Sequence, residues 1–148
     1  MAIHDALREL PGRKSEVRAA VAHWHPSSRR LTAFACGHAP LILIRSSGQV
    51  EHLAGESDTR LGGRARPRPA EAATTMASGD RLILVSDGVI DRSLDKGGRL
   101  GLDGIADAAR LPDTDGAAAT VRSVHDAVLS ASDADLDDDA AVICLALH

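Results

Sequence analysis

Two groups of carboxylates stand beside apolar segments of the sequence and could bind a divalent cation. Asp87 follows the largely apolar segment 81–85 and precedes Gly88, while Asp138 and Asp139 precede the closing apolar segment 140–147. A buried strand holds its end rigidly, so carboxylates at two strand ends can converge on one hard-oxygen site for Mn²⁺ or Mg²⁺. Such a cation lowers the pKa of bound water, so the pattern predicts metal-assisted attack on a phosphorus.

Each group also has an ordinary structural interpretation. Asp-Gly after a strand is a common turn, in which Gly88 lets the backbone turn sharply or leaves room for an ion or phosphate. The acidic segment 133–139 could be a solvated loop. Taken separately, the two groups leave both interpretations open.

The elements that must position these carboxylates follow from the hydrophobic periodicity. It predicts strands at 17–24, 31–36, 41–44, 50–53, 71–77, 81–85 and 140–147, the first two as a hairpin and the last as a central strand. It predicts helices at 3–10, ended by Pro11-Gly12, at 102–111, and at 117–131, capped by Thr114 or Asp115. Antiparallel strands followed by helices and a final strand indicate an α+β sandwich.

Composition limits the classes of protein further. With 148 residues, 44% of them hydrophobic, the chain can form one compact domain, and its core must be aliphatic because Trp24 and Phe34 are the only aromatic residues. The net charge of −4 is uneven: residues 1–74 carry 11 basic and 7 acidic side chains, and residues 75–148 carry 6 and 14. The acidic second half argues against a nucleic-acid partner and is compatible with a metal.

The cysteines and the apolar segments indicate the compartment. Cys36 and Cys144 lie in separate apolar segments, form no CxxC or Cys/His cluster, and are expected to be buried, reduced thiols. Residues 1–8 lack the apolar core of a signal peptide, and no stretch approaches the roughly 18 apolar residues of a membrane span. We therefore expect a cytoplasmic protein without a membrane partner.

Three motifs, in this order, resemble the SpoIIE-like branch of the PPM-type metal-dependent protein serine/threonine phosphatases. Residues 35–41, Ala-Cys-Gly-His-Ala-Pro-Leu, look like the family's AGHPP hairpin. Residues 79–91, which contain Gly-Asp-Arg-Leu-Ile-Leu-Val-Ser-Asp-Gly, look like GDxLLLYSDGVxE, and residues 138–142 are similar to the terminal DDxT/A motif. Shorter likenesses occur at 60–62 (PLG) and 100–102 (FG), so the resemblance extends from about residue 17 to the end.

The resemblance implies a fold and a reaction. The fold would be a partial PPM β-sandwich, mainly antiparallel, with helices packed on the outside. The reaction would be hydrolysis of phosphoserine or phosphothreonine by metal-activated hydroxide, without a covalent intermediate. The substrate would be a phosphorylated regulatory protein, such as an anti-sigma antagonist in bacterial partner switching.

The resemblance also implies roles for individual residues. Asp87 and Asp138 would be metal ligands, with Asp139 as the alternative if the register differs by one. His38 would belong to a structural hairpin, and Asp91 would cap the helix that follows it. The cluster of Arg60, Arg64, Arg66 and Arg68 could contact the substrate phosphate, with Arg60 and Arg64 as candidates, or could be a solvated loop.

The chain departs from the family pattern in its first half. The family's GDxxD and D-x-x-GHG motifs have no counterpart, and the sole acidic residue near the first strand is Glu16. We therefore expect residues 1–148 to form a single partial domain with an incomplete two-metal site. Two alternatives stay open: a non-catalytic, protein-binding module and a fragment of a longer protein. The missing layer would expose an apolar sheet face, which a homodimer could cover.

Overall fold

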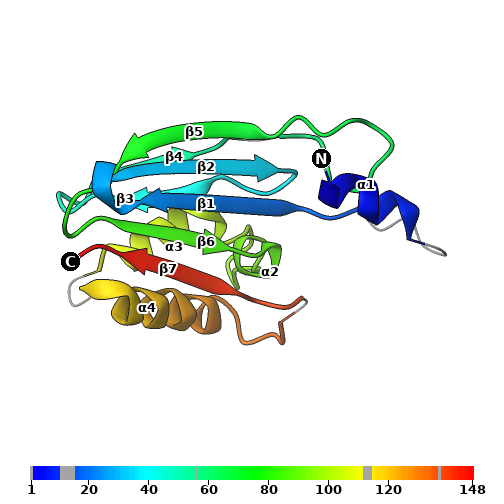
Figure 1. Cartoon of the computed structure of the whole chain (residues 1–148). Helices are drawn as coiled ribbons and strands as arrows, with labels where there is room; N and C mark the ends of the chain where they lie inside the picture. The colour runs from blue at the N-terminus through cyan, green and yellow to red at the C-terminus, as the bar shows by residue number, and fades with distance from the viewer. Residues whose placement is uncertain (1, 11–15, 56, 112–114, 137) are drawn as a thin grey trace. The chain divides into compact units, whose positions relative to one another are not determined.

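The computed structural model describes residues 2–10, 16–55, 57–111, 115–136 and 138–148 (Figure 1). The predicted helix end at Pro11-Gly12, the cap Thr114 and Asp137 lie outside the described residues. The elements follow in the order α1 (Ala2–Glu9), β1 (Ala19–His25), β2 (Arg30–Cys36), β3 (Leu41–Ile44), β4 (Val50–Leu53), β5 (Ala70–Thr75), β6 (Arg81–Val85), α2 (Asp87–Ile90), α3 (Gly101–Ala109), α4 (Gly116–Ser130) and β7 (Val142–Ala146). These strands and helices confirm the expected α+β class.

The described residues divide into two compact units. One contains residues 1–41 and 52–75, and the other contains residues 42–51 and 76–148. Each unit is described by itself below. The expectation of a single partial domain stays a prediction.

The first unit is built on the antiparallel sheet β1-β2-β5. The predicted hairpin of β1 and β2 is confirmed, with Val21 opposite Phe34. In β2 the residues Leu31, Ala33 and Ala35 are buried, because successive side chains of a strand point to opposite faces. Val17 forms an isolated bridge with Leu61 ahead of β1.

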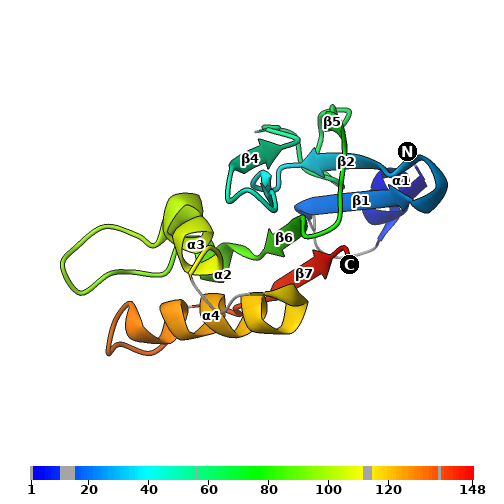
Figure 2. The same cartoon turned by 90° about the vertical axis from the view of Figure 1, so that its left-hand side faces the viewer.

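The second unit is built on the sheet order β4-β3-β6-β7, with α3 and α4 packed beside one another next to it (Figure 2). β3 is buried along its whole length, as its unbroken apolar sequence predicts. Alternate residues of the strands face the helices, and this core is entirely aliphatic, as the composition requires. The buried cluster consists of Ile42, Ile44, Ile83, Val85, Val89, Ile105, Ala106, Ala108, Ala109, Val124 and Val128.

The prediction of a central strand at 140–147 is wrong, because β7 is the edge strand of the described sheet and pairs only with β6. Val142 and Cys144 pack against the core, whereas Ile143 and Leu145 on the opposite face are 64% and 37% exposed. An apolar sequence does not show which strands lie beside it, and in β7 it did not show that one face is exposed. That is why the sequence pattern misplaced β7.

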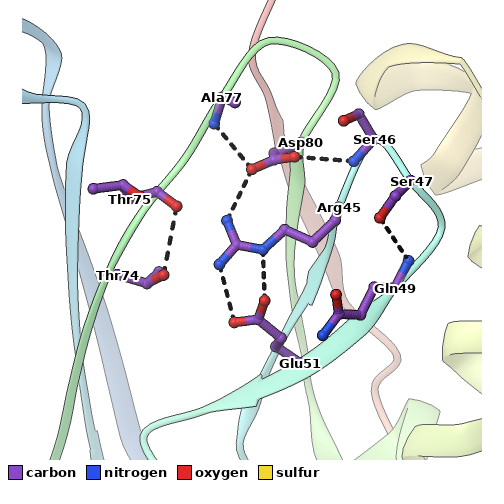
Figure 3. A network of polar contacts seen from close by, with 9 residues as sticks. All are labelled: Arg45, Ser46, Ser47, Gln49, Glu51, Thr74, Thr75, Ala77 and Asp80. Carbon is purple, nitrogen blue, oxygen red and sulfur yellow. Dashed lines mark hydrogen bonds and ion pairs between the residues drawn. The ribbon is translucent and has the colours of Figure 1, made fainter.

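The turns at one end of the second sheet are joined by a buried ion pair (Figure 3). Asp80, 2% exposed, accepts hydrogen bonds from the backbone amides of Ser46 and Ala77 at 2.9 Å each. Arg45 donates to Asp80 at 2.9 Å and to Glu51 at 2.6 and 3.0 Å. Burial opposes ionisation of Asp80, but the two amides and the guanidinium outweigh it and hold the pKa of this carboxyl below its usual range.

Asp80 therefore makes the stability of the chain depend on pH. Its stabilising effect is present above the unfolded pKa of about 3.9 and is lost as the pH falls through the lower folded pKa. We expect Asp80→Asn to lower the free energy of unfolding by about 2–3 kcal/mol at pH 7, and to reduce the loss of stability between pH 5 and 2.

Urea unfolding of wild type and variant across that pH range measures both effects. The control Asp126→Asn, on an exposed helix position, should change stability by less than about 0.5 kcal/mol. Parallel stability-against-pH curves for Asp80→Asn and wild type would contradict the assignment.

Candidate metal site

The end of β6 and the start of β7 are fastened together by Ser86. Its amide donates to the Ala141 carbonyl at 3.0 Å, and its hydroxyl accepts from the Ala141 amide at 2.9 Å. The same hydroxyl donates to the Asp139 carbonyl at 3.0 Å. The segment that carries Asp138 and Asp139 is thereby held against the turn that carries Asp87.

Gly88 makes this close approach possible. A Cβ at this position would lie 2.5 Å from the Asp139 carbonyl oxygen and 3.0 Å from that of Asp138. Real Cβ atoms do not approach backbone oxygens so closely, so only glycine fits. The space that the sequence assigned to an ion or phosphate at Gly88 is partly taken by the backbone of the acidic segment.

Asp87 and Asp138 line one cavity of about 310 Å³. Asp87 is half-buried as the first residue of α2, and Asp138 is exposed, with its Oδ1 accepting from the Asp139 amide at 2.8 Å. The cavity lining is Asp87, Gly88, Asp91, Arg92, Ser93, Arg99 and Asp138, and it does not include Asp139. The structure thus brings together the two carboxylates that the sequence singled out.

The chemistry of the donors in this cavity fits Mn²⁺ or Mg²⁺. Carboxylate oxygens are the ligands that these hard cations prefer, and three carboxylates, those of Asp87, Asp91 and Asp138, line the same cavity. Within the described ranges, no group of three or more His, Cys, Asp or Glu side chains is arranged to hold a metal. The described residues therefore offer Asp87 and Asp138 to such a site, while the third carboxylate, Asp91, is paired with Arg99.

The structure differs from the sequence-based predictions at Asp91 and at the cap of α4. Asp91 was expected to cap the next helix, but α3 has no side-chain cap, and Asp91 instead pairs with Arg99 at 2.5 Å. The intervening loop brings Arg99 back beside Asp91, and an isolated bridge between Ser93 and Arg99 closes that loop. Asp115 occupies the N-cap position of α4, without a side-chain cap hydrogen bond.

The remaining predicted residues lie in the first unit. His38 contacts the carbonyl of its neighbour Ala39 at 2.8 Å, in the hairpin region to which the sequence assigned it. Arg60 lies 3.9 Å from Glu16. The substrate contact expected of Arg60 and Arg64 stays a prediction.

The sequence analysis missed the basic residues of the cavity, Arg92 and Arg99. A signal was present, because three of the six basic residues in the acidic half, Arg92, Lys96 and Arg99, fall within eight positions after Asp91. Such clustering beside a carboxylate site indicates charge compensation or a phosphate contact.

Comparison with known proteins defines the class first. The chain has the fold of solved PPM-type serine/threonine phosphatase domains, over part of the length of those domains. Residues 2–148 match the family described as Stage II sporulation protein E (SpoIIE), and the chain belongs to this family.

Three solved structures illustrate the likeness. The SiaA-PP2C domain of Pseudomonas aeruginosa is 18% identical with a TM-score of 0.76, covering 98% of this chain and 58% of the other. The Mn-presoaked phosphatase domain of SpoIIE from Bacillus subtilis is 14% identical with a TM-score of 0.69, covering 88% and 56%. The RsbU and RsbW domains of Rv1364c from Mycobacterium tuberculosis are 18% identical with a TM-score of 0.70, covering 97% and 39%.

In each of these three comparisons, the match covers a large share of this chain and a smaller share of the other protein. This chain spans less than three-fifths of the length of each of these structures. No curated protein matches it. Among the described residues, no helix combines the length and the apolar character needed to cross a membrane.

The Gly88 contact generates a prediction. Gly88→Ala should displace the Asp138–Asp139 backbone and lower the free energy of unfolding by about 1–3 kcal/mol, because overpacking at a backbone contact forces the chain to shift. Thermal or urea unfolding measures the change.

Gly55→Ala is the matched control, since a Cβ there meets nothing within 4 Å and its backbone angles are ordinary. It should leave stability within about 0.5 kcal/mol of wild type. Equal stability of the two variants would refute the close approach.

Proposed function

We propose that Asp87 and Asp138 serve metal-dependent hydrolysis of phosphoserine or phosphothreonine in a regulatory phosphoprotein. The observation that carries this proposal is that both carboxylates line one cavity, at strand ends fastened by Ser86. Membership of the SpoIIE family and the PPM-type fold support the phosphatase class. The Mn-presoaked SpoIIE domain supports the choice of Mn²⁺ as the first cation to test.

Three residues of the chain would have distinct roles at the metal site. A bound Mn²⁺ or Mg²⁺ supplies Lewis acidity and makes water a stronger nucleophile at neutral pH. Asp87 and Asp138 would offset the charge of the cation and fix its position. Ser86 would orient the Asp138 segment, with its hydroxyl engaged at both the Asp139 carbonyl and the Ala141 amide.

Arg99 is the residue we propose for contact with the substrate phosphate. It lines the same cavity, its side chain is 68% exposed, and Asp91 holds it through a 2.5 Å ion pair. Guanidinium groups bind phosphate oxygens through two parallel hydrogen bonds. The side chain of Arg99 would therefore bind the phosphoryl group beside the two carboxylates.

The phosphoprotein partner is proposed from the family. Membership of the SpoIIE family supports it, because the sequence motifs resemble a branch of phosphatases that act on phosphorylated regulatory proteins in partner switching. The exposed guanidinium of Arg99 at an otherwise acidic half of the chain suits a phosphorylated side chain presented on a protein surface.

A second candidate function is a non-catalytic, protein-binding module. The observation that favours it is the coverage: the chain spans 56–58% of the SpoIIE and SiaA domains, so their remaining residues have no counterpart in it. In that case the cavity would bind a cation or a phosphorylated side chain without turnover.

Titration calorimetry with Mn²⁺ alone tests the site. Asp87→Asn and Asp138→Asn should each weaken Mn²⁺ binding about 100-fold, because each removes a charged oxygen ligand, whereas Asp139→Asn should change it less than about 3-fold. A loss with Asp139→Asn and none with Asp138→Asn would move the ligand to the alternative register. Wild-type affinity in all three variants would refute the site.

Phosphate release from a phosphoserine peptide, with and without Mn²⁺, separates the two functions. Turnover that depends on Mn²⁺ and is abolished by Asp87→Asn would establish catalysis by this chain. Mn²⁺ binding without turnover would establish the binding module. Turnover unchanged by Asp87→Asn would contradict the assignment of Asp87.

A further inference from the structure

A buried arginine follows the turn of Asp87 in the sequence and hydrogen-bonds the segment that leads to Asp138. Arg92 follows α2 directly, is 6% exposed, and lines the cavity that contains both carboxylates. Burying a guanidinium is costly unless its donors are satisfied. The hydrogen-bond acceptors of the Arg92 guanidinium therefore indicate why an arginine occupies this position.

Four backbone carbonyls accept hydrogen bonds from Arg92. Nε donates to Val128 at 3.1 Å, and one terminal nitrogen donates to Asp135 at 2.8 Å. The other terminal nitrogen donates to Ser132 at 2.6 Å and to Ala134 at 2.7 Å. Val128 is in the last turn of α4, where carbonyls lack helical partners and carry partial negative charge, so a cation is favoured there.

These contacts fix an irregular segment that follows α4. Residues 131–136, which include the first part of the acidic segment, follow α4, and they project on the same side of the second unit as the segment between α2 and α3 (Figure 2). The two segments also meet through the Asp95 amide, which donates to the Ala131 carbonyl at 3.1 Å. Arg92 thus holds one end of the acidic segment, and Ser86 holds the other.

We infer that Arg92 is a positioning residue of the metal site, fixing the backbone of residues 132–135 and thereby the distance between the carboxylates of Asp87 and Asp138. This inference rests on the proposed function of those carboxylates. Arg92 acts through its planar set of donors rather than through its charge. Lysine keeps the charge, but its single ammonium cannot reach four carbonyls arranged around a guanidinium.

The direction in which Arg92 substitutions change the Mn²⁺ affinity distinguishes a positioning role from a purely electrostatic role. Removing a positive charge beside two carboxylates should, by electrostatics alone, tighten the binding of a cation. Loss of positioning should weaken it. Arg92→Lys and Arg92→Gln should both weaken Mn²⁺ binding about 10-fold, whereas electrostatics alone would leave Arg92→Lys unchanged and make Arg92→Gln bind Mn²⁺ more tightly.

The test is Mn²⁺ titration calorimetry with the whole chain, combined with hydrogen exchange of residues 132–139. Both Arg92 variants should speed exchange in this segment. Asp80→Asn is the control for general destabilisation, because Asp80 precedes β6 and Asp87 follows it, so it should leave Mn²⁺ affinity and exchange at 132–139 unchanged. Arg92→Lys is the milder variant and keeps the measurement possible if Arg92→Gln does not fold.

Wild-type Mn²⁺ affinity and wild-type exchange in Arg92→Lys would overturn the inference, as would tighter Mn²⁺ binding in Arg92→Gln. Absence of Mn²⁺ binding by the wild-type chain would refute the metal site itself. In that case hydrogen exchange alone would decide whether Arg92 fixes the segment.

Discussion

The hydroxyl of Ser86 joins two strand ends, and the candidate site depends on that junction. β6 and β7 would bring their ends near one another by pairing alone, but pairing does not fix the irregular residues beyond them. Ser86 binds both the Asp139 carbonyl and the Ala141 amide, and Gly88 lets the acidic backbone approach within a distance that any Cβ would prevent. Carboxylates on two separate segments thus come to line one cavity.

Charge compensation is the second constraint on this half of the chain. Fourteen acidic and six basic side chains fall in residues 75–148, and the acidic segment concentrates several carboxylates in a few positions. Basic side chains of this acidic half interact with its carboxylates and backbone carbonyls. Arg92 satisfies the carbonyls that lead into the acidic segment, and Arg99 is held by Asp91 at the cavity.

The aspartates at the two ends of β6 lie in different environments. At its start, Asp80 joins two turns through the amides of Ser46 and Ala77 and through Arg45, all of which are satisfied. At its end, Asp87 lies in a cavity beside a second carboxylate. A buried carboxylate that accepts several hydrogen bonds stabilises the fold, whereas carboxylates that line one cavity can bind a cation. The motif that contains both aspartates therefore combines a structural residue with a candidate functional one.

The sequence by itself determined the elements and the two acidic positions. Periodicity located the seven strands and three of the helices to within a few residues, whereas the four-residue helix α2 was not predicted. The tertiary structure decided the edge position of β7, since strand order depends on partners distant in sequence. It also decided the pairing of Asp91 with Arg99 and the role of Arg92, whose acceptors are backbone carbonyls 36 to 43 residues away. Carbonyls carry no residue identity, so no sequence pattern could reveal them.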